Sequence, residues 1–205
     1  MTHDLLTVVP VRQGHFRLES GMHTDLWLTL DALFVSPRDL TPLTTALAGR
    51  LRPYDVSAVC GPLLGGAFLA HAVATFLGVG FYFSEPVPAP AEPGLFGAQY
   101  RIPSELQKRL GGERVALVDD VISAGSSVRA TERALNASGA STAVVGTLLA
   151  LGKVGLDHLA SLGIPCEALE QRDFSIWGPA TCPLCRAGVP LEDPAQDTLP
   201  PEPGG

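Results

Sequence analysis

Lysine and long apolar runs are both scarce in this 205-residue chain, and each shortage excludes a class of protein. Of the 14 Lys and Arg residues only Lys108 and Lys153 are lysines, and the formal net charge is −7. No basic stripe runs along the sequence, so we expect no nucleic-acid partner. No stretch of eighteen apolar residues occurs, so we expect no membrane-spanning helix. The first residues also lack the basic and apolar regions of a signal peptide, which predicts a soluble cytoplasmic protein.

Cysteine is scarce as well, with four residues in the chain. Cys60 and Cys166 lie in apolar, strand-like runs and are expected to be core thiols. Cys182 and Cys185 have metal-knuckle spacing, but a closed zinc site needs two further ligands and no second Cys-x-x-Cys occurs. We interpret this pair as a structural motif of the C-terminal region. Zinc shared across a dimer is the alternative.

Strand-like and helix-like segments alternate along most of the sequence. This order predicts an α/β fold with a mostly parallel sheet covered by helices on both faces. Ligands of such sheets bind at the carboxyl ends of the strands. We expect one domain over residues 1–193 and a Pro-rich, disordered tail over 194–205. The expected strands cover residues 56–60, 79–84, 115–118, 141–151 and 165–169, and the expected helices 4–11, 36–51, 67–77, 104–110, 128–137 and 154–162.

The most informative segment joins an apolar run over 115–118 to two adjacent acids, Asp119 and Asp120. A turn of small residues over 123–127 follows, and then a helical run. Backbone N–H groups of such a turn and helix start favour an anion, and the serine hydroxyls add donors. The acids, expected to face solvent where the strand ends, can accept hydrogen bonds from vicinal ribose hydroxyls. A solvated acidic turn is the plainer alternative, but it does not explain the whole run.

This segment resembles the phosphoribosyl pyrophosphate motif of type I phosphoribosyltransferases. Three further segments resemble the orotate phosphoribosyltransferases among them: residues 15–28 their N-terminal hood, 59–67 their pyrophosphate loop, and 177–191 the C-terminus of some members. The resemblance covers roughly residues 4–193. It implies the type I phosphoribosyltransferase fold, with a hood built from residues 1–35 and 165–193.

The resemblance also implies a reaction and a set of roles. Orotate and phosphoribosyl pyrophosphate would give orotidine monophosphate and pyrophosphate, with Mg²⁺ carried by the substrate, in a homodimer. Asp119 and Asp120 would hold the ribose hydroxyls near the developing ribosyl cation. Orotate would meet Ser123, Lys153 and Trp27. Phosphoribosyl pyrophosphate would also contact Val121, Ile122, Ser123, Ala124, Gly125, Ser126, Ser127, Leu63, Leu64, Gly65 and Gly66.

Several positions depart from that family pattern. The segment that carries Lys, Arg and His in the family has here one cation, Arg101, with Glu85 and Glu92, and its 85–97 stretch has none. Glu19 stands where many members have a basic residue, and Lys153 lacks the bidentate fork of an arginine. Two alternatives therefore stay open: a phosphoribosyl pyrophosphate-binding regulator with weak or no turnover, and an enzyme for another base. A zinc-linked interaction module at Cys182 and Cys185 is a third.

Overall fold

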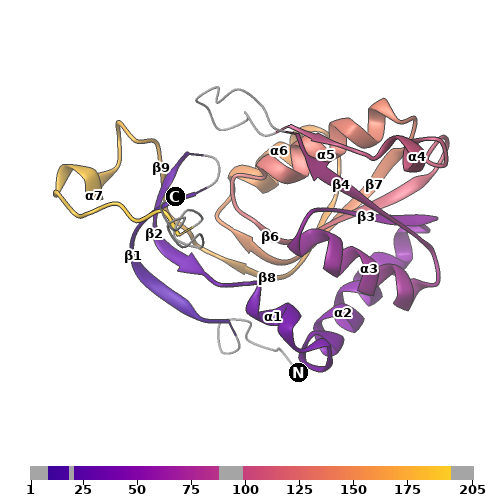
Figure 1. Ribbon diagram of the computed structural model, residues 1–205, viewed down its shortest axis with the longest axis horizontal. Helices are drawn as coiled ribbons and strands as arrows, with labels where there is room; N and C mark the ends of the chain where they lie inside the picture. The colour runs from indigo at the N-terminus through magenta and orange to yellow at the C-terminus, as the bar shows by residue number, and fades with distance from the viewer. Residues whose placement is uncertain (1–8, 19–20, 88–98, 195–205) are drawn as a thin grey trace, which may run out of the picture.

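The computed structural model describes residues 9–18, 21–87 and 99–194 (Figure 1). The expected helix over 4–11 lies mostly outside these ranges, and its last residue, Val11, begins a strand instead. Of the expected tail over 194–205, only Pro194 is described. Across the described ranges, no helix combines the length and apolarity needed to cross a membrane.

A six-stranded sheet forms the body of the molecule, as the alternation of strands and helices predicts. Neighbouring strands are parallel except at one edge, where β5 runs antiparallel to β4. The order across the sheet is β5 (Tyr100–Arg101), β4 (Gly80–Pro86), β3 (Ala58–Pro62), β6 (Arg114–Ile122), β7 (Ser141–Leu151) and β8 (Cys166–Arg172).

Helices cover both faces of this sheet because its central strands are apolar on both sides (Figure 1). In β6, Val115 and Leu117 pack into one buried cluster, whereas Ala116 and Val118 pack into the other. Such continuous apolar runs are typical of strands buried on both faces. One face carries α2 (Pro37–Leu51) and α3 (Gly65–Leu77), and the other carries α4 (Ser104–Gln107), α5 (Ser126–Ala137) and α6 (Val154–Ser161).

A second, three-stranded antiparallel sheet stands beside the body, at the left in Figure 1. It joins β1 (Val11–Arg17) and β2 (His23–Leu28) to β9 (Ile176–Trp177), which is followed by α7 (Pro183–Arg186). We call β1, β2, β9 and α7 the hood. Because β8 belongs to the main sheet, the expected C-terminal hood boundary at residue 165 is too early: the chain enters the hood after Arg172.

Short segments connect the larger elements. From β2 of the hood the chain enters the body through α1 (Ala32–Val35), which precedes α2, while the 3-10 turn η2 (Arg52–Tyr54) joins α2 to β3 within the body. The leucine stripe expected in the helix over 36–51 is confirmed: Leu40, Leu43, Leu47 and Leu51 are buried against the sheet. Cys60 is fully buried in β3, as expected, while Cys166 at the start of β8 is half-buried.

Candidate active site

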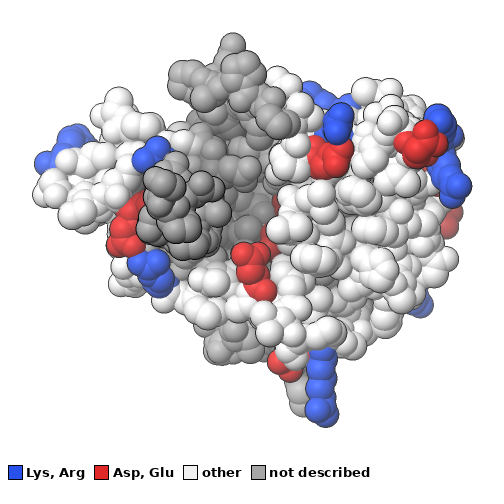
Figure 2. All heavy atoms as spheres, viewed as in Figure 1, with Lys and Arg blue, Asp and Glu red and all other residues white. Residues whose placement is uncertain are grey.

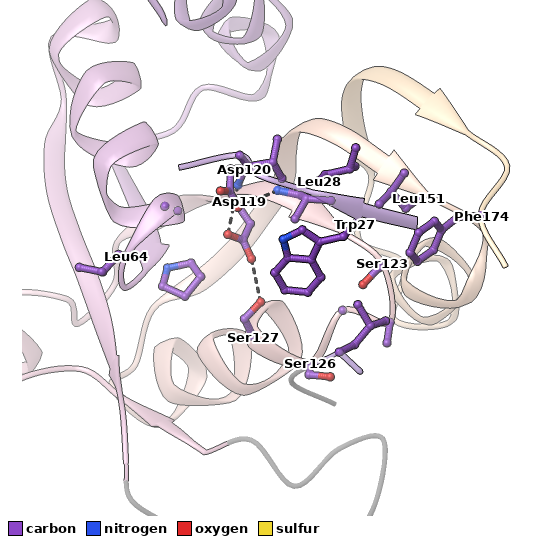
Figure 3. A pocket seen from close by; sticks show the side chains of 18 of the residues that line it. Trp27, Leu28, Leu64, Asp119, Asp120, Ser123, Ser126, Ser127, Leu151 and Phe174 are labelled. Carbon is purple, nitrogen blue, oxygen red and sulfur yellow. Dashed lines mark hydrogen bonds between the residues drawn. The ribbon is translucent and has the colours of Figure 1, made fainter. Parts of the chain in front are cut away.

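A cleft of about 300 Å³ lies where β3 and β6 end at the carboxyl edge of the sheet, with β2 of the hood as a further wall (Figure 3). It brings together the two segments that the sequence singles out, 63–66 and 119–127. Residues of β2 in the hood also line the cleft, although no sequence pattern connects them to these two segments. The lining includes Leu63, Leu64, Gly65, Gly66, Asp119, Asp120, Val121, Ser123, Ala124, Gly125, Ser126, Ser127, Leu26, Trp27 and Leu28.

The acid pair lies inside a strand and not after it, which corrects the expectation. β6 continues through both acids to Ile122, and Asp119 stands opposite Thr147 of β7. Asp119 is only 5% exposed, so the prediction that both carboxylates face solvent is wrong for this residue. The reason is that β6 is a central strand, with β3 and β7 on its two sides and the first turn of α3 packed over its end.

Hydrogen bonds hold both carboxylates in place (Figure 3). The Ser127 hydroxyl donates to Asp119 Oδ2 at 2.7 Å, and the Asp120 backbone N–H donates to Asp119 Oδ1 at 3.1 Å. The Val121 N–H donates to Asp120 Oδ1 at 2.8 Å. Ser127 therefore orients Asp119, and its hydroxyl proton is engaged by that carboxylate.

Burial makes this pair electrostatically unusual. Loss of hydration, followed by the neighbouring charge of Asp120, raises the pKa of Asp119 well above its usual range. Loss of hydration also raises the pKa of Asp120, although its bond from the Val121 N–H opposes the shift. A cation or a hydrogen-bond donor of a ligand would stabilise the ionised form of these buried carboxylates strongly.

Glycines let the loop after β3 approach the acids closely. A Cβ atom at Gly65 would lie 2.3 Å from Asp120 Oδ2, and one at Gly66 would lie 2.7 Å from Asp119 Oδ1. At Gly61 a Cβ would meet the Gly66 carbonyl oxygen at 2.0 Å. No side chain fits at such distances, so these glycines bring the first turn of α3 against the end of β6. A cis peptide bond joins Leu63 and Leu64 in the same loop.

The turn after β6 forms the opposite wall of the cleft. Gly125 has φ 76°, in the left-handed region that favours glycine, and Ser126 then begins the twelve-residue helix α5. The N–H groups of the first helical turn lack partners within a helix, so they present donors there. The predicted cup over residues 123–127 is thus at the surface of the cleft. Ile122, expected to contact the ligand, is instead buried in the core under α5.

The hood supplies an apolar wall, with the Trp27 indole pointing into the cleft (Figure 3). Apart from Trp27, sequence analysis missed this wall. Leu151 had a usable signal, because it ends an expected strand at the carboxyl edge. The others stand in segments without a local pattern that marks a site. On the hood side the missed lining residues are Leu18, Leu26, Leu28, Leu30 and Phe174; strands of the main sheet contribute Pro62, Tyr100 and Leu151.

Lys153 does not line this cleft. It stands at the start of α6, on a neighbouring cavity of about 700 Å³ that also includes Asp25 and Asp173. The two cavities share Leu26 and Phe174. Lys153 is therefore next to the predicted base site but outside its lining. Cys182 and Cys185 line neither cavity.

Cations are missing from the described lining of the cleft, where Asp119 and Asp120 are the only charged side chains. Arg101 is paired with Glu85 across the β4–β5 edge, with its Nη2 2.8 Å from Glu85 Oε1. On the face in Figure 2, described charged side chains stand in small separate groups and do not form a basic patch. Glu19 and Glu92 lie outside the described residues.

Comparison with known proteins identifies the family. The chain is 33% identical to an orotate phosphoribosyltransferase of Thermotoga maritima over 194 residues, covering 91% of this chain and 92% of that protein. The chain belongs to the orotate phosphoribosyltransferase family. The resemblance noted in its sequence is thereby confirmed. No protein-family model matches it.

Solved structures confirm the fold. An orotate phosphoribosyltransferase from Aeropyrum pernix matches with a TM-score of 0.59 at 23% identity, covering 78% of this chain and 87% of that one. An adenine phosphoribosyltransferase from Rhodothermus marinus matches with a TM-score of 0.64 at 20% identity, covering 81% and 95%. The predicted type I phosphoribosyltransferase architecture is confirmed. At 23% and 20% identity, these solved structures support the fold alone.

Proposed function

We propose that this protein transfers the phosphoribosyl group of phosphoribosyl pyrophosphate to orotate, forming orotidine monophosphate and releasing pyrophosphate. The observation that carries this proposal is the cleft itself. A buried acid pair, a glycine loop and a helix-start cup meet in one cavity of a family member. In the reaction, the bond from ribose C1′ to pyrophosphate breaks while a ring nitrogen of orotate forms a new bond to C1′.

The cup over 123–127 holds the 5′-phosphate in this proposal. Its support is the start of α5, where the direction of the first-turn N–H groups and the helix dipole favour an anion. Asp119 and Asp120 then accept hydrogen bonds from the ribose hydroxyls, near the positive charge that develops at C1′. Because hydrogen bonds and positive charge favour the ionised form of a carboxyl group, the bound substrate would lower both raised pKa values again.

Pyrophosphate lies against residues 63–66 in this proposal. This segment lines the cleft immediately beside the acids, and its glycines leave the backbone open to close approach. The N–H groups of Leu64, Gly65 and Gly66 would stabilise the leaving group without any side-chain charge, whereas the Leu63 N–H donates to the Ser84 carbonyl oxygen at 2.8 Å. Such fixed dipoles suit a transition state that separates charge, because they need no reorganisation.

We propose Mg²⁺ as the cation that accompanies the substrate. The donor set fits a hard divalent ion, since carboxylate oxygens are the charged groups of the described lining. When bound, Mg²⁺ supplies charge neutralisation for the pyrophosphate. The chain's own part is to keep Asp119 and Asp120 oriented through Ser127 and backbone N–H groups.

Orotate would occupy the hood side, against Trp27 and Phe174. The cavity lined by Lys153 shares Leu26 and Phe174 with the cleft, so the Lys153 ammonium would lie near the carboxylate of an orotate bound there. Ser123, which lines the cleft, supplies a further hydrogen-bonding group. An apolar wall with a few polar groups at one end is a common arrangement for a planar base.

A homodimer acting in the cytoplasm completes the proposal. Val35, Leu64 and Phe68 are exposed apolar side chains; Leu64 lines the cleft, and Phe68 contacts Phe34 with ring centroids 5.6 Å apart. Covering this surface with a second copy would bury it and bring a partner's cations to the pyrophosphate. Unpaired thiols among the described residues suit a reducing compartment. Sedimentation analysis of the purified chain tests the assembly.

The decisive experiment follows the absorbance of orotate with purified protein, phosphoribosyl pyrophosphate and Mg²⁺. We expect orotate to be consumed in step with pyrophosphate release, and adenine and uracil to be poor replacements. Turnover of another base in preference to orotate would refute the proposed acceptor while keeping the phosphoribosyl site.

A second function is favoured by one observation, the absence of cations from the described lining of the cleft. A regulator that binds phosphoribosyl pyrophosphate without efficient turnover needs the cup and the acids but not the charges that help pyrophosphate leave. The same assay separates the two functions. Tight binding with no orotate consumed over hours would establish the regulator.

A further inference from the structure

Four metal-ligating side chains converge in the hood, outside the cleft. His15 comes from β1, His23 from β2, and Cys182 and Cys185 from the start and the middle of the α7 segment. Their ligand atoms all lie within 4.8 Å of one another. The two ligands that the Cys-x-x-Cys motif lacked are thus histidines of the same chain, more than 150 residues earlier in the sequence.

The spacing of these atoms is that of a tetrahedral site. His15 Nε2 lies 3.1 Å from His23 Nδ1 and 3.4 Å from Cys182 Sγ. Cys185 Sγ lies 3.7 Å from His15 Nε2 and 3.2 Å from His23 Nδ1. Zinc bound at about 2.0–2.1 Å to nitrogen and 2.3 Å to sulfur separates its ligands by roughly 3.3–3.8 Å. The four separations are close to these values and all four ligand atoms lie within 4.8 Å of one another, so one central ion can contact all of them.

A second contact supports the role of His15. Its Nδ1 lies 2.9 Å from the Val189 carbonyl oxygen, which can only accept, so Nδ1 carries the proton. The Nε2 lone pair is then directed at the other three ligand atoms. A backbone carbonyl that orients a metal-binding imidazole in this way is a regular feature of protein zinc sites.

Burial adds a physical reason for an ion. His15, His23 and Cys182 are at most 5% exposed, and Cys185 closes the site at the surface. Lone-pair donors gathered in a buried space are better satisfied by one shared cation than by one another. Both thiols are free, so no disulfide competes for them.

We propose that these residues form a Cys₂His₂ zinc site with a structural role. Four protein ligands leave no open position, which distinguishes structural from catalytic zinc. The ion would tie the β1–β2 hairpin to the C-terminal segment. The small hood sheet would thereby gain a cross-link that its short strands do not provide. This site is independent of the phosphoribosyl cleft and of its proposed reaction.

The test measures metal in the full-length protein, purified under reducing conditions without chelator. We expect about one zinc per chain by mass spectrometry. The zinc-free protein should take up one Co²⁺ and show the intense visible bands of tetrahedral thiolate coordination. It should also unfold at a lower temperature than the zinc-loaded protein. Absence of both zinc and a tetrahedral Co²⁺ spectrum in the folded wild type would overturn the proposal.

Variants locate the ion. Cys185→Ser and His23→Gln should each lower the zinc content and abolish the tetrahedral Co²⁺ spectrum, while Cys166→Ser, a thiol in the main sheet, should retain both. The wild-type Co²⁺ spectrum still decides the matter if a ligand variant fails to fold. Full zinc content in Cys185→Ser, or loss of zinc in a folded Cys166→Ser protein, would contradict the assignment.

Discussion

The body and the hood are held together by different means. The body has two large buried clusters, one on each face of its six-stranded sheet. The hood has three short strands, and Phe16 is its one large side chain in the fully buried class among the described residues. Its ties are polar: the His and Cys cluster, and ion pairs from Arg12 and Arg17 to Glu192 and Asp193. The cleft therefore has two parts. Its floor, residues 62–66 and 119–127, belongs to the body, and its hood wall depends on these polar contacts.

The largest effect is expected from the floor. Replacing Asp119 and Asp120 together by Asn should lower turnover by roughly 10²–10⁴-fold, because two charge-assisted hydrogen bonds of about 1.5–3 kcal/mol each are lost. An Asn at 119 can still bond to Ser127 and to the Asp120 position, so the fold should survive. Steady-state kinetics and circular dichroism test this. The control is Asp55→Asn, an exposed site at the opposite end of β3; an equal loss there would refute the assignment.

The glycine loop is the next most sensitive part of the floor. Gly66→Ala forces a Cβ against Asp119 and Pro62, and should cost about 1–3 kcal/mol in stability while displacing the acid. Denaturant unfolding and kinetics should both show the loss. Gly49→Ala, in an exposed helical position of α2 with open space around it, should instead stabilise the protein by about 0.5–1 kcal/mol. Similar behaviour of the two variants would contradict the close approach.

Lys153 tests whether the second cavity belongs to the base site. Lys153→Gln should raise the KM for orotate by roughly 10- to 100-fold and leave the KM for phosphoribosyl pyrophosphate nearly unchanged, since one charge-assisted contact is worth about 1.5–3 kcal/mol. Initial-rate kinetics with each substrate varied in turn would show this split. A proportionate rise in both KM values would mean that Lys153 acts through the structure and not on orotate.

The pH dependence of stability tests the burial of Asp119 in the body. Its raised pKa means that the folded state prefers the protonated acid. Burial of Asp119 therefore lowers the free energy of unfolding wherever the unfolded chain has an ionised Asp119. This loss is absent below the unfolded pKa of about 3.9 and grows as pH rises toward the folded pKa. Asp119→Asn should gain stability over the wild type as pH increases through this window, by thermal unfolding at several pH values. A gain that is largest at the acid end would reverse the sign and refute the burial argument.

The hood ion pairs should give the smallest effect. Arg12 and Glu192 are both substantially exposed, so Glu192→Gln should change stability by about 0–1 kcal/mol, less at high salt. Chemical denaturation at two salt concentrations measures it. Removal of zinc should weaken the hood more than this variant does. The opposite order would mean that ion pairs, and not the metal, hold the hood.

Local patterns were enough to predict the body. Each signal lies within one short stretch of sequence: the strand and helix periods, the acid pair before 123–127, and the glycines of 61–66. The structure places the last two of these segments at one edge of the sheet. The burial of Asp119 was missed because it depends on β7 and on α3 packing over β6. Nothing in the chemistry of two neighbouring acids reveals that they will be covered.

The hood was predictable only in part, because its contacts join distant segments. Trp27 was found through the resemblance, but Phe174 reaches the cleft from a segment without a motif. His15 and His23 stand eight residues apart in a hairpin, and only the pairing of β2 with β9 brings Cys182 and Cys185 to them. Long-range register of this kind cannot be read from spacing alone.

The most direct test of the site is calorimetric titration of phosphoribosyl pyrophosphate with Mg²⁺ into the wild type and into the double Asn variant. The wild type should bind one ligand per chain, and the folded variant should show at least a hundredfold weaker binding. Equal affinity in the two proteins would show that the acids and the cup beside them do not hold the phosphorylated ribose.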